Sequence, residues 1–272
     1  MSVRIPNVFC KKNRILLYEL TKTDFKLRYQ GSVLGYLWAL LRPLMLFAIM
    51  YIVFAVLLKM GNNIPHYPVY LLVGTSMWSF FTECTNQGLQ AMVVRGDLIR
   101  KISFPNYVVV VSATLTAVIN MLINLAVIVV FALINGVTPS LSWLLVPVFL
   151  IELYALSLGI AFLLGAINVK YRDIMSIWEV LLQALFYAVP ILYPISMVAA
   201  TSQLAAKVLL LNPIAQIIQD IRYCLITKET IISWTYLGNK TYAFCSVMVV
   251  ALILIAGGLY FRKRSRFFAE EI

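Results

Sequence analysis

The sequence predicts an all-α integral membrane protein with six transmembrane helices. Hydrophobic residues make up 62% of the 272 residues, and they fall into six long blocks separated by short basic or Pro- and Asn-rich breaks. A helix needs roughly twenty apolar residues to cross the hydrocarbon core of a bilayer, and only helices and closed barrels satisfy their backbone groups in lipid. The whole chain, 1–272, is therefore expected to form a single membrane domain without a large soluble domain.

The first element is expected to be an amphipathic helix over about 8–29. On a helix, Phe9, Leu16, Leu20 and Leu27 share a sector roughly 40° wide, and the basic residues lie outside it. This pattern is typical of a helix that lies on the membrane surface; an ordinary packed helix is the alternative. The expected parts of the domain are this helix within 1–32, spans one to five within 33–194, an extracytoplasmic segment over 195–241, and span six with a basic tail over 242–272.

The six apolar blocks are the predicted spans. The second is the most polar and carries Glu83, Asn86 and Gln87, the third has no charge, and the fourth contains Glu152. The approximate ranges of the spans are 33–58, 69–91, 107–134, 142–167, 174–194 and 242–261.

The segment 195–241, which precedes the last span, holds two short apolar stretches that are broken at Asn212-Pro213. Each stretch is too short to cross a bilayer. They are therefore expected to form re-entrant or interfacial half-helices.

The distribution of Lys and Arg predicts the orientation. Sixteen of the 22 Lys and Arg residues lie in the N-terminal segment, in the breaks at 92–106 and 168–173, and in the C-terminal tail, whereas five lie on the other side. The positive-inside rule places the sixteen, and with them both termini, in the cytoplasm. A single crossing by 195–241 would place the basic RKRSR tail outside, so the charges also favour the re-entrant interpretation.

Residue types required for catalysis or metal binding are sparse. No phosphate-binding loop of the G-x-x-x-x-G-K-[ST] type occurs, the four cysteines are scattered without a CxxC pair, and the single histidine, His66, lies beside two prolines in a loop. We therefore expect no enzyme activity, no metal and no cofactor on this chain. The net charge of +11 is explained by topology and anionic lipid headgroups, so no nucleic acid is expected as a partner.

Acidic residues inside spans are the usual indicators of function in a membrane protein. Glu83 and Glu179 lie near the cytoplasmic ends of their spans, where pairing with nearby basic residues is the alternative to a role in ion coupling. Glu152 lies near the middle of span four, and for this residue a functional role and a structural pairing both remain open.

Deep aromatic residues and closely spaced glycines give two further indications. Tyr51, Phe81, Phe186 and Tyr187 lie inside spans, where they can stack on sugar rings along a polar path or simply pack between helices. Gly31 and Gly35 form a GxxxG pattern, which suits either a helix–helix contact in a dimer or a bend before span one.

Six segments of the chain together resemble the permease subunit of ABC-type polysaccharide exporters, the type-2 ABC exporters of O-antigen, capsular polysaccharide and teichoic acid. The segments occur in the family's order and extend over nearly the entire chain. They are KLRYQGSVLGYLWALLRPL (26–44), YLLVGTSMWSFF (70–81), LIRKISFP (98–105), NVKYRDI (168–174), LFYAVPILYPISMV (185–198) and LNP (211–213).

The resemblance implies a homodimer in the bacterial cytoplasmic membrane, bound to two copies of a separate ATPase subunit that holds ATP and Mg²⁺. It also implies that the ATPase pushes on the N-terminal helix and on the RGDLIRKISFP loop. Arg95, Asp97, Arg100 and Lys101 would make charge-assisted contacts there. Anchoring of the topology is their simpler role, and the two roles are compatible.

The resemblance further implies a channel between two permease copies that face each other through spans one and five. A lipid-linked glycan would enter from the cytoplasmic leaflet, with its lipid moving beside the helices. The half-helices around Asn212 and Pro213 would form the outer gate. The candidates for stacking on the sugars are Tyr51, Phe186, Tyr187 and Tyr193.

Three other functions remain open. An ABC permease for a drug, haem or a simple lipid is the nearest, but such relatives typically carry larger extracytoplasmic domains than the short loops here. A proton-driven carrier would show inverted repeats, and the chain has no convincing internal symmetry. A membrane-embedded glycan or lipid transferase would need a clustered acidic or histidine site, whereas Glu83, Glu152 and Glu179 lie on separate spans.

Overall fold

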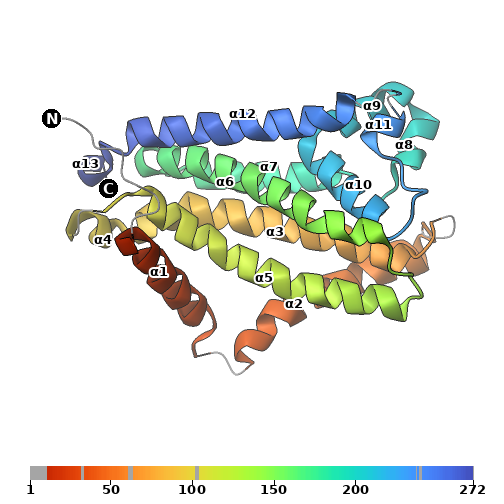
Figure 1. The fold of residues 1–272 in the computed structure, drawn as a ribbon, viewed down its shortest axis with the longest axis horizontal. Coiled ribbons are helices and arrows are strands. Elements are labelled where there is room, and N and C mark those ends of the chain that lie inside the picture. Colours follow the sequence, from red (N-terminus) through yellow and green to blue (C-terminus); the bar gives the residue numbers. More distant parts are fainter. Residues whose placement is uncertain are drawn as a thin grey trace.

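The protein is a bundle of long helices with groups of short helices at its two ends (Figure 1). The computed structural model describes residues 11–31, 34–60, 64–101, 104–236, 238 and 241–271. Every regular element in that part of the chain is a helix, which confirms the predicted all-α fold. The elements are α1 (Lys11–Tyr29), η1 (Gly35–Leu37), α2 (Trp38–Tyr51), η2 (Ile52–Leu57), α3 (Tyr67–Val94), α4 (Gly96–Lys101), α5 (Tyr107–Ile134), η3 (Leu141–Leu145), α6 (Val146–Lys170), α7 (Ile174–Ala188), α8 (Ile195–Thr201), α9 (Gln203–Leu211), α10 (Pro213–Leu225), α11 (Ser233–Tyr236), α12 (Thr241–Arg264) and α13 (Phe268–Glu271).

Helix α3 lies at the centre of the bundle. It contacts α2, α5, α6, α7 and α10, and Figure 1 shows α3, α5, α6 and α12 running along the long axis of the molecule. Large side chains of α3 such as Leu71, Met77 and Phe81 are completely buried. Its central place agrees with its polar sequence, because polar side chains at membrane depth are stabilised by facing protein rather than lipid.

Among the described residues, four helical segments are long and apolar enough to cross a membrane: Gly35–Leu57, Tyr107–Ile134, Leu141–Lys170 and Phe244–Arg264. They coincide with the predicted spans one, three, four and six, so the prediction of an integral membrane protein with several spans is confirmed. α3 has 28 residues but is more polar than these four, and α7 has only 15 residues.

Helix α7 is shorter than the predicted fifth span, 174–194. The helix ends at Ala188, and Val189 has extended backbone angles, with φ −88° and ψ 137°. Pro190 explains this end, because a proline disfavours helical angles in the residue before it and has no N–H to continue the helix. Tyr193 therefore lies beyond α7, in the stretch that leads to α8.

The predicted break at Asn212-Pro213 is confirmed. Helices α9 and α10 meet there at an angle of 93°. The side-chain oxygen of Asn212 accepts a hydrogen bond from the backbone N–H of Ile214 (3.0 Å), and Pro213 occupies the first turn of α10. Both features are typical of a helix N-terminus, so these two residues end one helix and start the next.

Helix α1 packs along α5 and is followed by a turn. Gly31 and Gly35 have φ angles of +83° and +49°, and a Cβ atom on either would have no neighbour within 4 Å. Because these angles do not fit a continuous helix, the structure supports the bend rather than the helix contact as the role of the GxxxG pattern. Phe9 of the predicted apolar stripe lies outside the described residues, as do Ser32 and Val33.

Helices α6 and α12 approach each other closely at paired glycines. A Cβ atom on Gly257 would collide with the backbone oxygen of Gly159, and a Cβ atom on Gly159 would lie 2.8 Å from the Cα atom of Leu254. Small residues of this kind let membrane helices touch through their backbones. Gly258, the next residue, faces open space.

Candidate functional site

The exposed face of α7 carries a polar stripe. The helix packs against α3 through the opposite face, where Trp178 and Leu182 are buried. A glutamate that faces hydrocarbon is unstable, so the stripe requires an aqueous or protein environment. The exposed residues of the stripe share a sector roughly 80° wide on the helix and are Ser176, Glu179, Gln183 and Tyr187.

Three of the four predicted stacking residues lie together at the end of α7. The Phe186 ring lies 5.3 Å from the Tyr187 ring, edge to face, and the Tyr193 hydroxyl donates a hydrogen bond to the Tyr187 backbone oxygen (3.0 Å). Tyr187 itself is 70% exposed. Of this cluster, the Tyr187 ring therefore faces outward, at the end of the polar stripe to which it belongs.

Tyr51 belongs to a different aromatic group. Its ring lies 5.9 Å from that of Phe47, which in turn contacts the ring of Phe131 on α5 at 5.4 Å. Within the part of the chain that the structure describes, no ring contact joins Tyr51 to the α7 cluster. The four predicted stacking residues therefore lie in two places within one copy of the chain.

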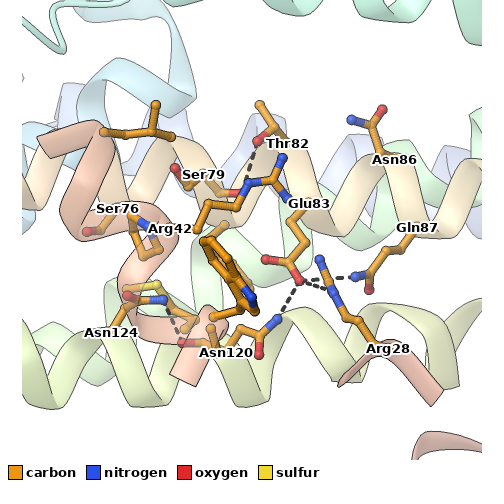
Figure 2. Close-up of a pocket in the computed structure, with 16 residues that line it drawn as sticks. Arg28, Arg42, Ser76, Ser79, Thr82, Glu83, Asn86, Gln87, Asn120 and Asn124 are labelled. Atoms are coloured by element: carbon orange, nitrogen blue, oxygen red, sulfur yellow. Dashed lines mark hydrogen bonds and ion pairs between the residues drawn. The ribbon is translucent and has the colours of Figure 1, made fainter. Parts of the chain in front are cut away.

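A polar cavity of about 710 Å³ lies between α1, α2, α3 and α5. Figure 2 shows Arg28, Gln87 and Asn120 converging on the carboxylate of Glu83. Arg28 forms an ion pair with it, while the Gln87 and Asn120 amides donate hydrogen bonds at 3.0 and 2.6 Å. These contacts support pairing with a basic residue, rather than ion coupling, as the role of Glu83.

A smaller cavity of about 200 Å³ continues from the first, with Arg28 and Gln87 lining both. Asp24 and Arg95 line its other part and form an ion pair with each other, and Arg95 also donates a hydrogen bond to the Ser112 hydroxyl (2.9 Å). Two ion pairs therefore attach α1 to the bundle: Arg28 with Glu83 on α3, and Asp24 with Arg95, which directly follows α3.

The four predicted coupling residues differ in their surroundings. Arg95 is bound to α1 and α5 as just described. Asp97, Arg100 and Lys101 are exposed on α4, which the buried Ile99 anchors to the bundle. Figure 1 places α4 at the same end as α1 and α13, opposite α8 to α11. The structure thus places three of the four at the surface of one end of the molecule.

The most unusual polar residue is Arg222 on α10, which the sequence alone does not single out. Its side chain is completely buried, donates hydrogen bonds to the backbone oxygens of Tyr70 (3.2 Å), Pro190 (2.7 Å) and Ile191 (2.6 Å), and lies 3.5 Å from the centre of the Tyr70 ring. Arg222 is one of the five cations that the charge count assigned to the side opposite the sixteen, and the structure shows that its side chain is folded into the bundle rather than exposed in a loop. The residue joins α10, α3 and the end of α7.

The remaining candidates have simple surroundings. Glu152 on α6 accepts a hydrogen bond from the Ser246 hydroxyl on α12 (2.6 Å), a contact that supports structural pairing. His66 precedes α3 and accepts two backbone hydrogen bonds through its carbonyl oxygen. No cluster of three or more metal-binding side chains occurs among the described residues.

Comparison with known proteins matches residues 15–226 to the family described as ABC-2 type transporter. The chain is 30% identical to the O-antigen export system permease protein RfbA of Myxococcus xanthus, over 95% of this chain and 96% of the relative. It is also 30% identical to an RfbA permease of Klebsiella pneumoniae, over 94% of each chain, and 28% identical to another from the same species. Together with the four long apolar helices, these similarities confirm the predicted localisation as a multi-pass protein of the bacterial cytoplasmic membrane.

Proposed function

Because the chain belongs to the ABC-2 type transporter family, we propose that it is the permease subunit of an ATP-driven exporter of lipid-linked polysaccharide. Two copies form the permease, and two copies of a separate ATPase subunit bind ATP and Mg²⁺ and supply the energy. The relatives in Myxococcus xanthus and Klebsiella pneumoniae support the class of substrate, because each is named as an O-antigen export permease.

The observation that carries the proposal is the polar stripe of α7. Ser176, Glu179, Gln183 and Tyr187 are exposed in a single copy, although α7 belongs to a predicted span. Helix α2 and the η2 turn that continues it are similarly uncovered, with Ile49 of α2 and Ile52 of η2 more than half exposed. A second copy that faces the first through α2 and α7 would enclose the two stripes, and a hydrated conduit between them removes the cost of exposing Glu179 to lipid.

The proposed topology has six crossings, made by α2, α3, α5, α6, α7 and α12, with α9 and α10 as a re-entrant pair. The 93° bend between α9 and α10 supports the re-entrant pair. In this proposal Asn212 and Pro213, which lie at the bend, form the outer gate. The basic end that carries α1, α4 and α13 then lies in the cytoplasm, where the ATPase binds.

The stacking role of Tyr187 gives the first test. We expect Tyr187→Ala to lower export of a lipid-linked glycan roughly 5- to 10-fold, because one exposed aromatic contact contributes about 1 kcal/mol. Export is measured in proteoliposomes that contain the permease and its ATPase. Phe244→Ala is the matched control, since Phe244 on α12 is also 70% exposed but lies away from the stripe. Equal export by the two variants would contradict the proposed conduit.

The coupling role of α4 gives the second test. We expect the double change Arg100→Glu and Lys101→Glu to reduce export at least 10-fold while the ATPase subunit continues to hydrolyse ATP, because the reversed charges repel the acidic partner surface that the two cations would contact. Lys207→Glu, an exposed cation at the opposite end, should leave the ratio of export to hydrolysis unchanged. A normal ratio of export to hydrolysis in the double variant would show that α4 does not couple ATP hydrolysis to export.

A further inference from the structure

The cavity between α1, α2, α3 and α5 has the composition of a binding site rather than of a helix contact. Helix α3 lines it with polar side chains one turn apart, at Ser76, Ser79, Glu83 and Gln87. A polar ridge at membrane depth is normally covered by a neighbouring helix. Here about 710 Å³ of space separates it from α2, which is within the size range of sites for small ligands.

Two groups in the cavity lack partners among the described residues. The side-chain oxygen of Gln87 is buried and accepts no hydrogen bond, and the Arg42 guanidinium on α2 takes part in no hydrogen bond or ion pair. Figure 2 shows Arg42 above the Glu83 cluster, facing the same space. Because Arg28 already neutralises Glu83, Arg42 leaves the cavity with an uncompensated positive charge.

These groups match a phosphate joined to a sugar. A guanidinium binds phosphate oxygens through paired hydrogen bonds, and Arg42 is available for this. The open acceptor of Gln87 and the amide of Asn86 suit sugar hydroxyls, while Trp38, which also lines the cavity, offers a ring for stacking. An unglycosylated phosphate would use only the cation and would leave the amides unpaired.

A second cavity adjoins this one on the side of the basic end of the bundle. The second cavity of about 200 Å³ shares Arg28 and Gln87 with it and extends to Asp24 and Arg95, near α4. A headgroup in the leaflet on that side would approach Arg42 through the second cavity, past Arg28 and Gln87. Resting on the proposed export function, we propose that this cavity binds the glycosyl-phosphate headgroup of the lipid-linked substrate before it enters the conduit.

The test measures binding by the full-length permease in nanodiscs, without its ATPase. The probe is a synthetic lipid with a diphosphate-linked disaccharide as its headgroup. We expect Arg42→Gln to weaken binding at least 10-fold, whereas Arg172→Gln, which removes an exposed cation outside the cavity, should change it less than twofold. Equal affinity of Arg42→Gln and the unmodified protein would overturn the proposal. Since Arg42 has no partner within the described chain, its replacement should leave the unfolding temperature unchanged.

Three further probes separate the possible ligands. The same lipid without its disaccharide should bind at least fivefold more weakly, and Asn86→Leu should abolish that difference. Equal affinity for the lipids with and without sugar would overturn the sugar part of the proposal. Inorganic diphosphate that binds as tightly as the glycolipid would identify a site for the free anion, and free disaccharide that binds as tightly would identify one for the sugar alone; either result overturns the proposal.

Export measured in parallel keeps the two hypotheses distinct. If the unmodified permease and its ATPase export the glycolipid but Arg42→Gln binds and exports normally, the headgroup site is wrong and the proposed function stands. If the unmodified pair transports no glycolipid, the proposed function itself fails, whatever the binding data show.

Discussion

Replacing Arg222 by methionine is expected to lower the unfolding temperature of the purified protein by roughly 10 °C. Methionine fills a similar volume but donates no hydrogen bonds. The backbone oxygens of Pro190 and Ile191 then lose these donors in a buried site, and the Tyr70 oxygen, which lies within α3, loses its hydrogen bond from Arg222. Each buried acceptor left unpaired costs about 1–3 kcal/mol, and the contact with the Tyr70 ring is lost as well.

Thermal unfolding followed by tryptophan fluorescence in detergent provides the measurement for Arg222. Arg222→Lys should give an intermediate loss, because an ammonium keeps the charge but lacks the planar fork that reaches three carbonyls. Lys207→Met, at an exposed cation on α9, should leave the unfolding temperature nearly unchanged. If Arg222→Met unfolds at the temperature of the unmodified protein, the three hydrogen bonds do not hold α10 in place.

Gly257→Leu is expected to prevent the normal packing of α12 on α6 and to remove most of the folded protein. Its Cβ atom would collide with the backbone oxygen of Gly159, and the two backbones have no flexible side chain between them that could yield. Overpacking in a well-packed core typically costs 1–3 kcal/mol, and a leucine at a backbone contact exceeds that range because the helices must separate.

Gly258→Leu is the matched control, because it introduces the same side chain one residue along α12, where a Cβ atom meets nothing within 4 Å. The yield of monodisperse protein on size-exclusion chromatography and its unfolding temperature report the effect. We expect both to fall strongly for Gly257→Leu and to stay near the unmodified values for Gly258→Leu. Similar behaviour of the two variants would mean that the glycine contact does not determine the packing.

The elements that could be predicted are those that depend on local chemistry. The uncharged third block, 107–134, has the same bounds as α5. It is a long apolar run, and the Pro before it and the Asn-Gly after it are residues that commonly mark helix ends. The break at Asn212-Pro213 follows from capping by Asn and from the place of Pro in a first helical turn. The end of α7 at Ala188 was missed, although Pro190 provided the signal.

The contacts that could not be predicted join residues far apart in the sequence. Arg28 and Glu83 pair across 55 positions, and Arg222 reaches the carbonyl of Tyr70 across 152. Helix periodicity shows which face of a helix is polar, but it does not show which other helix lies opposite that face. The cavity at Arg42 was missed for the same reason: its four walls come from separate helices.

The attachment of α1 to the bundle is expected to depend on the lipids around it. Two ion pairs, Arg28–Glu83 and Asp24–Arg95, join α1 to α3 and to the residue that follows it, and both are partly accessible to solvent. Two glycines with positive φ angles separate α1 from α2. Such pairs contribute little on their own and weaken as ionic strength rises. We expect acidic headgroups to compete with Glu83 and Asp24 for the same guanidinium groups, so that a leaflet rich in anionic lipid weakens both ion pairs while α1 keeps its packing along α5.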